Sequence, residues 1–387
     1  RSANENPDVV KRVIVGNEVM LRKEMPIERL IDYIRQVKQA VKQPVSYADV
    51  WSMYMKYPQL FKEVDFITIH ILPYWEDEPI AIEHAPEHLE KIVRQVENEA
   101  HGIAPGKAIL IGESGWPSAG RQRGEAVPSV VNSAKFIRGM IQVAQQHGFD
   151  YNIVEAFNQP WKSKLEGVVG ANWGLLAVNR QPVFPLTGPV YENPDWPWHF
   201  AIATAVWLLI AASHFKSLRS LSWGRALVFL TLAQIISVCW VTLGDFLWYT
   251  SYSNLQRAYT LSMVALNAAL AWGILQHCAN VLARTSDDQR LALWLSRGYL
   301  VFIVLALYKT LMLSVNGRYL SFPLEQFSIP AWGIVGMLLS QSLAQRRFGF
   351  TTSAFDILRG ANMTAVRWRQ LTYVLSMAIV AMVVGET

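Results

Sequence analysis

Two glutamates stand where short apolar segments end, and their chemistry could support catalysis. Glu18 follows the segment at 11–17, and Glu113 comes two residues after the segment at 107–111. Two carboxyl groups on either side of one sugar carbon can cleave a glycosidic bond, because the protonated one donates to the leaving oxygen while the ionised one attacks. Retention of configuration requires carboxyls about 5–5.5 Å apart. A strand-end glutamate is also often only a solvated carboxylate, and spacing alone leaves both alternatives open.

The surrounding sequence predicts parallel βα units that would bring these side chains together. Apolar, β-branched segments alternate with segments of helical periodicity. The expected strands are 11–17, 44–51, 65–72, 107–111 and 151–157, and the expected longer helices begin near 26, 87 and 129. In a (β/α)₈ barrel the carboxyl ends of the strands converge on the active site. A doubly wound open sheet also alternates, but the absence of a GxGxxG or P-loop motif favours the barrel.

Two longer segments carry a specific resemblance. VIVGNEVMLR around Glu18 and AILIGESGWPSAG around Glu113 resemble the two catalytic segments of glycoside hydrolase family 17, the β-1,3-glucanase family. FNQPWK and NWGLL, between 157 and 176, resemble the end of that family's eighth strand and its closing segment. The resemblance implies that Glu18 is the acid/base and Glu113 the nucleophile. It implies no cofactor.

The same resemblance places Glu18 on the fourth strand of a barrel, although it lies only 18 residues into the chain. We therefore expect the C-terminal part of a TIM barrel, strands 4–8, in a chain that is truncated at its N-terminus and need not be active alone. An incomplete arc of strands has an open edge and an unfilled interior.

Polar and aromatic side chains near the strand ends are the expected substrate-binding residues. Aromatic rings suit the CH faces of glucose, although ordinary packing is the alternative for some of them. The candidates are Asn17, Tyr74, Trp75, Trp116, Phe157, Trp161 and Trp173. Tyr74 is also expected to hydrogen-bond the nucleophile. His70 lies inside a strand and is interpreted as a core histidine, and with no second ligand at a suitable spacing no metal is expected.

The composition changes near residue 198. A proline-rich linker at 177–198 separates a partial barrel, 1–176, from an all-α transmembrane domain of about six helices, 199–387. Several of the apolar runs approach the length of about 20 residues that spans a bilayer. The runs are 199–215, 227–250, 258–283, 298–315, 331–345 and 371–384.

Loop charge predicts the orientation of these spans. The loops 216–226, 284–297 and 346–370 are rich in Lys and Arg, whereas the loops 251–257 and 316–330 each hold a single arginine. The positive-inside tendency places the basic loops in the cytoplasm. We therefore expect a multi-pass protein of a bacterial inner membrane with its catalytic domain in the periplasm.

The first functional hypothesis is a retaining glycosidase or transglycosylase that acts on β-1,3-glucan at the outer face of the membrane. Bacterial family members with membrane helices resemble proteins described as β-(1-6)-glucan synthases, which implies elongation or branching of a glucan. The expected partners are β-glucan, the lipid bilayer and a glucan synthase, but no nucleic acid, because basic and aromatic residues do not cluster. The alternative is a membrane transport or scaffold protein with a vestigial sugar-binding domain, which the missing strands favour and the intact segments oppose.

Overall fold

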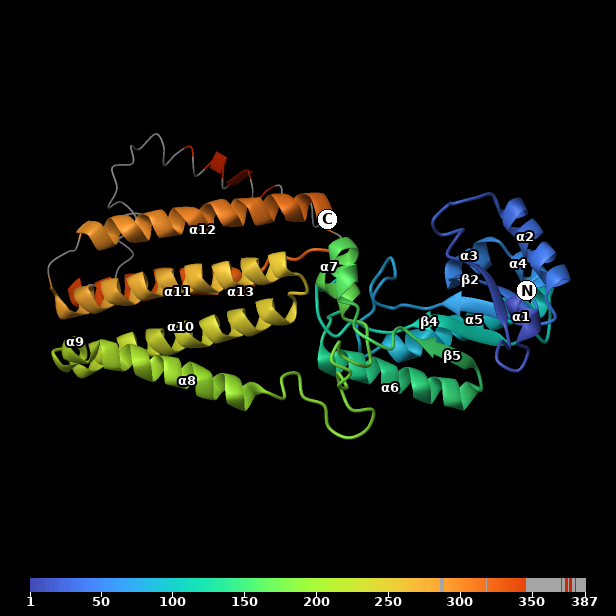
Figure 1. Cartoon of the computed structure of the whole chain (residues 1–387), viewed down its shortest axis with the longest axis horizontal. Coiled ribbons are helices and arrows are strands. Elements are labelled where there is room, and N and C mark those ends of the chain that lie inside the picture. The colour runs from blue at the N-terminus through green and yellow to red at the C-terminus, as the bar shows by residue number, and fades with distance from the viewer. Residues whose placement is uncertain are drawn as a thin grey trace. The chain divides into compact units, whose positions relative to one another are not determined.

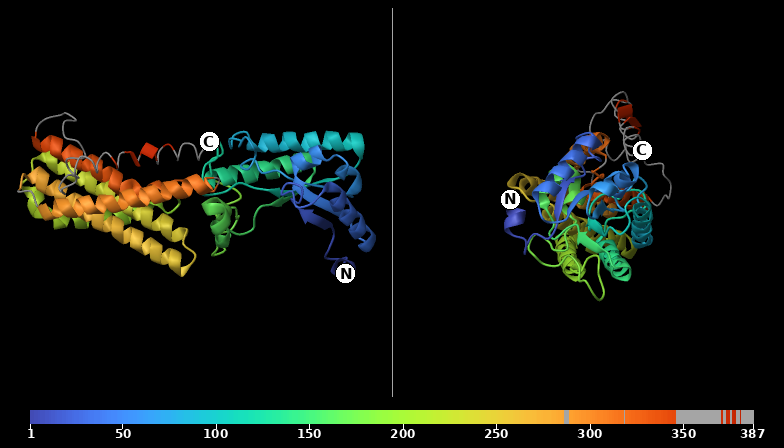
Figure 2. Two further views of the ribbon diagram at one scale, coloured as in Figure 1. Left: turned by 90° about the horizontal axis from the view of Figure 1, so that it is seen from above. Right: turned by 90° about the vertical axis from the view of Figure 1, so that its right-hand side faces the viewer.

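A computed structural model describes residues 1–285, 289–317 and 319–345, together with 370, 373, 374, 376, 377 and 380. The chain divides into two compact units, Arg1–Glu192 and Asn193–Thr387. In Figures 1 and 2 the blue-to-green unit alternates arrows with coiled ribbons, whereas the yellow-to-orange part is helical throughout.

The first unit is built on one sheet whose five strands are all parallel and stand in sequence order. The strands are β1 (Val13–Asn17), β2 (Val45–Val50), β3 (Ile67–His70), β4 (Ile109–Ser114) and β5 (Asp150–Ile153). Arg12, just before β1, forms a 2.6 Å ion pair with Asp150 of β5. The sheet is therefore curved enough to bring its two edges within reach of one arginine side chain. The predicted fold class, a partial (β/α) barrel followed by a helical region, is confirmed.

Amphipathic helices cover the sheet. They are α1 (Ser2–Glu5), α2 (Ile27–Ala40), α3 (Trp51–Lys56), α4 (Leu60–Glu63), α5 (Ala85–Ile103), α6 (Val130–His147), the 3₁₀ turn η1 (Pro160–Lys162) and α7 (Ser163–Ala171). Helix α2 buries Ile27, Leu30 and Ile34 at the three- and four-residue spacing of one helix face. It packs on β1 and β2, α3 packs on β2 and β3, and α6 packs on β5. These three helices therefore cover strands next to them in sequence, whereas α5 packs on α3, α4 and α6.

The segment that follows β4, Gly115 and Trp116, packs tightly against the core next to the strand ends. Trp116 is completely buried, and its indole N–H donates to the Val127 carbonyl at 3.1 Å. Gly115 lies so close to β5 that a Cβ there would stand 2.1 Å from the Val154 carbonyl oxygen. Only glycine permits this approach of the two backbones, which explains why a glycine separates the Glu113 strand from Trp116.

The second unit is helical in the part that the structure describes. Its helices are α8 (Trp196–Ser213), α9 (Phe215–Arg219), α10 (Trp223–Tyr249), α11 (Asn254–Ala283), α12 (Gln289–Asn316) and α13 (Leu324–Gln345). Helices α10, α11 and α13 pack on one another around a core that includes Phe229, Leu270 and Ile274. α8 packs on α10, and α12 packs on α11 and α13.

Five of these helices, all except the short α9, are long and apolar enough to cross a membrane. They correspond to the first five predicted apolar runs. The first begins at Trp196, inside the predicted linker, because Pro197 fits the first turn of a helix, where its missing N–H has no partner to lose. The sixth predicted run, 371–384, lies largely outside the described residues, as does the basic loop 346–370.

The close approach at Gly115 yields a stability prediction. In Gly115→Ala the new methyl group must displace the β5 backbone, and overpacking of this kind costs about 1–3 kcal/mol. We expect the temperature at which residues 1–192 become sensitive to trypsin to fall by several degrees. Gly102→Ala is the matched control, because nothing lies within 4 Å of a Cβ at that helical position. Equal stability of the two variants would contradict the packing described for Gly115.

Candidate active site

The backbone at the end of β1 sets the position of Glu18. Gly16 has φ +80°, and Glu18 itself adopts φ +54°, a left-handed conformation that is uncommon for a residue with a side chain. The β1–β2 register shifts between Ile14 and Asn17, and beyond this irregularity the Glu18 N–H still donates to the Ala48 carbonyl at 2.9 Å. A bulge at a strand end commonly redirects a side chain, and here it turns Glu18 away from the regular strand alternation.

A buried carboxylate on β2 fixes the loop after Glu18. Asp49 accepts hydrogen bonds from the backbone N–H groups of Met20 at 3.1 Å and Leu21 at 3.3 Å, and from the Tyr47 hydroxyl. The Tyr47 oxygen also accepts from the Met20 N–H at 2.9 Å. Because the Met20 N–H and the Tyr47 hydroxyl are buried, loss of Asp49 would weaken the hydrogen bonding of buried donors at a cost of about 1–3 kcal/mol. The loop that carries Glu18 is thus tied to the neighbouring strand.

Glu113 lies on β4 directly beside His70 on β3, after a second irregularity in register. The residue before it, Gly112, has no Cβ, and a Cβ there would lie 2.7 Å from Thr68 Cγ2 and 3.0 Å from the His70 ring. This glycine therefore makes room for the imidazole. Glu113 is half-buried and His70 is only 2% exposed.

The three side chains meet at the carboxyl ends of their strands. A carboxylate oxygen of Glu18, one of Glu113 and a ring nitrogen of His70 all lie within 4.8 Å of one another. His70 Nδ1 lies 3.1 Å from Glu18 Oε1, and the Arg22 guanidinium donates to Glu18 Oε2 at 2.9 Å. The two predicted glutamates, 95 positions apart in sequence, are therefore neighbours in space.

The pKa values of the two carboxyls shift in opposite directions. The hydrogen bond with His70 lowers the pKa of Glu18 despite its partial burial, and the charges of His70 and Arg22 add to the effect. Burial raises the pKa of Glu113, and the negative charge of Glu18 adds to the rise, whereas His70, Lys162 and Arg22 oppose it. These directions favour the ionised form of Glu18 and the neutral form of Glu113.

Distance alone would allow a cation to bind at this cluster. Among the described residues, Glu18, His70 and Glu113 are the group of possible ligands close enough to share one. However, Glu18 already pairs with His70 and with the Arg22 guanidinium, whose positive charge opposes a second cation. We therefore treat these residues as a pair of reactive carboxyls with a histidine partner.

A second polar group borders the site beyond β5. Lys162 donates to Glu155 Oε2 at 2.9 Å, and the Gln159 side chain amide donates to the same oxygen. The other oxygen of Glu155 is buried without a hydrogen-bond partner. The positive charge of Lys162 acts on Glu113, as its effect on the pKa of that carboxyl shows. In the sequence Lys162 stands out only as part of the FNQPWK segment, and no sequence pattern singles out Glu155.

The structure separates the predicted substrate-binding residues into two groups. Tyr74 and Trp116 are fully buried, so no surface remains for a sugar ring, and the prediction that they bind substrate is corrected. The Tyr74 hydroxyl donates to the Arg121 carbonyl at 2.6 Å instead of to Glu113. Both residues lie in the aromatic core beneath the site, because their polar atoms find backbone partners there.

Four of the remaining candidates keep accessible surface, whereas Trp173 is only 6% exposed. Asn17 is exposed at the end of β1, and Phe157 and Trp161 are 43% and 62% exposed after β5. Trp75 is half-buried and stacks on Trp173, with ring planes 18° apart. The surfaces of Trp75, Phe157 and Trp161 are thus accessible to a ligand.

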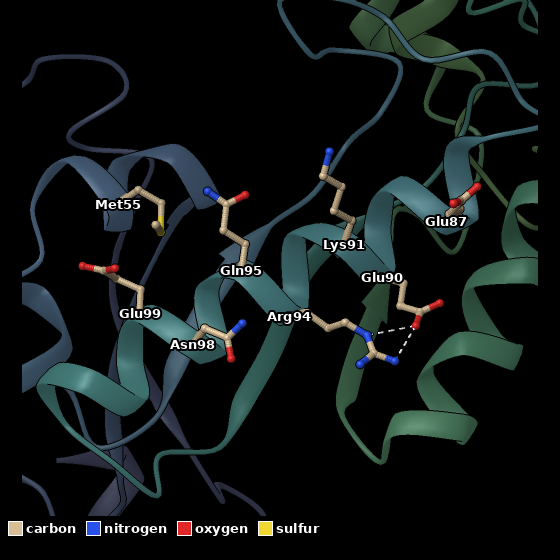
Figure 3. A pocket seen from close by; sticks show the side chains of 8 residues that line it. All are labelled: Met55, Glu87, Glu90, Lys91, Arg94, Gln95, Asn98 and Glu99. Atoms are coloured by element: carbon tan, nitrogen blue, oxygen red, sulfur yellow. Dashed lines mark hydrogen bonds and ion pairs between the residues drawn. The ribbon is translucent and has the colours of Figure 1, made fainter.

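A separate surface groove contains none of these residues. It runs along the outward side of α5, where Glu87, Lys91, Arg94 and Asn98 line it together with Met55 from α3 (Figure 3). Arg94 there pairs with Glu90 one turn away, as the dashed lines mark. The strand-end glutamates do not line it, so we assign the chemistry to the strand ends.

The curved parallel sheet carries two neighbouring carboxyls at its strand ends, which is the pair of groups that cleavage of a glycosidic bond requires. Residues 1–174 match the family model of the BtgE/BtgC glycoside hydrolase domain. A glucan 1,3-β-glucosidase of Arthroderma benhamiae is 29% identical over 203 residues, which cover 49% of this chain and 65% of that protein. A protein of Saccharomyces cerevisiae named "Probable family 17 glucosidase SCW4" is 29% identical over 44% of each chain.

A solved structure is also similar. The family 17 β-1,3-glucanosyltransferase of Rhizomucor miehei is 33% identical over 45% of this chain and 62% of its own, with a TM-score of 0.39. An active-site mutant of a β-1,3-glucanosyltransferase from that organism, in complex with laminaritriose, is 32% identical over 44% of this chain and 61% of its own, with a TM-score of 0.40. The chain spans less than two thirds of these relatives. Residues 1–174 thus match a glycoside hydrolase domain model and are similar in sequence to family 17 proteins.

The two pKa directions predict opposite effects of neutralising each glutamate. The folded-state pKa of Glu113 is raised, so its ionisation disfavours folding as the pH rises from about 4.5 through the folded value. Glu113→Gln removes this effect, and the melting temperature of the variant relative to the unmodified chain should increase between pH 4 and pH 7. The folded-state pKa of Glu18 is lowered, so its contribution is present above the unfolded value and is lost as the pH falls.

Glu18→Gln is the control of opposite sign for this experiment. It should be less stable than the unmodified chain at pH 7, and the difference should shrink toward acidic pH. Trypsin sensitivity of residues 1–192 as a function of temperature and pH measures both variants. If the two show the same sign, the electrostatic description of the site is wrong.

Proposed function

We propose that this chain cleaves β-1,3-glucan by double displacement with retention of configuration. The observation that carries the proposal is the separation of at most 4.8 Å between oxygen atoms of Glu18 and Glu113. Retaining glycosidases hold their carboxyls about 5–5.5 Å apart, whereas inverting enzymes leave about 6.5–9.5 Å for a water molecule. The names of the relatives support β-1,3-glucan as the substrate.

In this mechanism Glu113 attacks the anomeric carbon while Glu18 gives a proton to the leaving oxygen. A covalent glucosyl ester forms on Glu113, and Glu18 then removes a proton from the acceptor that releases it. The Glu-Ser-Gly-Trp-Pro-Ser segment supports the nucleophile assignment, since it resembles the nucleophile segment of family 17. The lowered pKa of Glu18 and the raised pKa of Glu113, taken alone, would instead favour Glu18 as the nucleophile and Glu113 as the acid. An experiment that labels the nucleophile is therefore essential.

Accessible aromatic rings around the carboxyls supply the proposed sugar contacts. Phe157 and Trp161 follow β5, and Trp75 follows β3, so glucose units on either side of the cleaved bond could stack on them. Asn17, exposed beside Glu18, is placed to hydrogen-bond a sugar hydroxyl. Exposed aromatic rings on the segments after β3 and β5 suit a polymer of glucose better than a small charged ligand.

We also propose that the five long apolar helices anchor the enzyme in a bacterial inner membrane, with the catalytic domain on the periplasmic side. The support is the alternation of basic and less basic loops, since basic loops tend to remain in the cytoplasm. An enzyme in this position would meet glucan as a synthase releases it. Such an enzyme could elongate the glucan or add β-1,6 branches, because hydrolysis and transfer share the same covalent intermediate.

Mechanism-based labelling tests the two carboxyl roles. A 2-deoxy-2-fluoro-laminaribiosyl fluoride should modify Glu113 covalently, because the fluorine slows release of the ester more than its formation. Peptide mass spectrometry should find the label between residues 107 and 121, and Glu113→Ala should abolish both the label and the turnover of laminari-oligosaccharides. Glu125→Ala, at an exposed loop position, is the matched control and should retain both. A label on Glu18, or normal turnover by Glu113→Ala, would refute the assignment.

The lengths of the products distinguish transfer from hydrolysis. With laminaripentaose as the sole substrate, we expect products longer than the donor, because the exposed rings after β5 offer a binding surface for an acceptor sugar. Mass spectrometry of the reaction mixture over time measures this. If every product is shorter than the donor at all substrate concentrations, the enzyme is a hydrolase and the transfer proposal fails.

A further inference from the structure

His70 occupies an unusual place for a histidine of the core. Its side chain, at the end of β3, is almost completely buried, and Nδ1 lies 3.1 Å from Glu18 Oε1. Gly112 leaves space for the ring, so the packing of β4 accommodates an imidazole at this position. The partner of this buried histidine is the carboxyl to which the proposed function assigns acid/base catalysis.

To act as an acid Glu18 must be protonated, but the charges around it lower its pKa and favour the ionised form. The same contacts that fix the carboxyl, to His70 and to Arg22, favour its ionised form. An ionised Glu18 cannot protonate a leaving oxygen, so another group has to supply the proton. A general acid normally has its pKa near the working pH, and an imidazole titrates closer to neutrality than a carboxyl.

We propose that His70 is a positioning residue for Glu18 that also holds the proton which Glu18 delivers to the leaving group. This inference rests on the proposed function. In the first step the proton moves from His70 Nδ1 to Glu18 Oε1, and the carboxyl so formed gives it to the glycosidic oxygen. The bond from the anomeric carbon to that oxygen breaks as a bond to Glu113 forms. His70 ends this step neutral and Glu18 ionised.

The second step reverses the proton movement. Water or a sugar hydroxyl attacks the glucosyl ester, and its proton passes to Glu18 and then to His70 Nδ1. The bond to Glu113 breaks, so Glu113 regains its negative charge and the pair regains its proton. No other reactant is needed, and the site returns to its starting state.

The other charged groups around the carboxyls cannot take this role. Arg22 faces Glu18 from the loop after β1, but a guanidinium does not release its proton in proteins. Lys162 faces Glu113, and its ammonium is paired with Glu155 at 2.9 Å. Asp49, on β2, accepts from the backbone of Met20 and Leu21 and not from Glu18. Glu113 lies as close, but it must be ionised to attack the anomeric carbon and so cannot hold this proton. Of the other described ionisable groups around Glu18, His70 is thus the one able to exchange a proton with it.

Substrates with different leaving groups test the inference in the full chain. Laminaritetraose needs a protonated leaving oxygen, whereas 2,4-dinitrophenyl β-laminaribioside does not. His70→Ala should lose about 10²-fold in kcat/KM on laminaritetraose, the lower end of the usual contribution of a general acid, and less than threefold on the aryl substrate. Equal losses on both substrates, or no loss on either, would overturn the inference.

The pH profile separates proton holding from simple positioning. If the proton is shared as proposed, the pair should keep it to higher pH than a carboxyl alone, because an imidazole ordinarily releases its proton at higher pH than a carboxyl. The basic limb of kcat/KM for laminaritetraose should therefore move to lower pH in His70→Ala, by about one to two units. His70→Asn keeps a polar N–H donor but cannot hold an exchangeable proton, so its basic limb should move in the same way. Restoration of the original profile by asparagine would show that positioning alone matters.

Two controls complete the design. His101→Ala, at an exposed position of α5, should leave the rates and the profile unchanged. In a Glu18→Ala background, His70→Ala should cause no further loss, because the proton would have no carboxyl to pass through. A further loss there would contradict the proposed route.

A measurement without turnover distinguishes failure of this inference from failure of the proposed function. In ¹⁵N-histidine-labelled full chain, the His70 signal, identified by its loss in His70→Asn, should titrate at a different pH after Glu18→Gln. An unchanged titration would refute the coupling whether or not the chain is active. Normal turnover by Glu113→Ala would instead refute the proposed function and leave the Glu18–His70 coupling to this titration.

Discussion

The arrangement of the site depends on one contact, between the carboxyls of Glu18 and Glu113 with the His70 imidazole beside them. Each side chain comes from the end of a different strand, β1, β3 and β4, and their polar atoms approach to within 4.8 Å. Two carboxylates this close repel each other, and burial strengthens the repulsion. The site accommodates them by pairing Glu18 with His70 and Arg22, while burial favours the neutral form of Glu113.

This contact requires a curved sheet. β1 and β4 are separated by two strands in sheet order, so a flat sheet would hold Glu18 and Glu113 roughly 14 Å apart at the usual strand spacing. Register irregularities at the carboxyl ends of β1, β3 and β4 redirect the side chains, and the Arg12–Asp150 ion pair links the first and last strands. Asp49 then fixes the loop after β1. The fold thus places its irregular backbone where the chemistry is located.

The sequence predicts the architecture well, because β-branched strands and periodic helices are local patterns. The two glutamates could be identified from their motifs, and the fold class from the alternation of elements. The sequence does not predict which aromatic residues are accessible. Tyr74 and Trp116 look like sugar-binding residues from their place after strands, but their burial is decided by packing between segments far apart in sequence.

His70 is a second residue whose contacts the sequence does not predict. Its position inside a strand correctly predicts burial, but not its contact with Glu18, which lies 52 positions earlier. The ion pair between Arg22 and Glu18 could have been predicted, because the two residues are four positions apart in sequence. The paired Glu155 and Lys162 depend on the turn after β5, whose conformation no periodic pattern indicates.

The helices of the second unit could be predicted from their apolar composition, without any specific motif. Its helices are apolar around most of their circumference, which suits a lipid environment better than a surface facing water. Some polar side chains of this unit find local partners, such as the pair formed by Ser251, in the turn after α10, and Thr260 of α11, which limits the cost of their burial. By length and composition, five of these helices are therefore able to cross a membrane.

The central claim is that the two carboxyls lie close enough to act on one anomeric carbon without an intervening water molecule. The anomeric configuration of the first product, observed by ¹H NMR before mutarotation, tests this most directly. With laminari-oligosaccharides the β-anomer should appear first, because two displacements at the same carbon restore the original configuration. Initial release of the α-anomer would mean a single displacement by water, and would contradict the geometry assigned to Glu18 and Glu113.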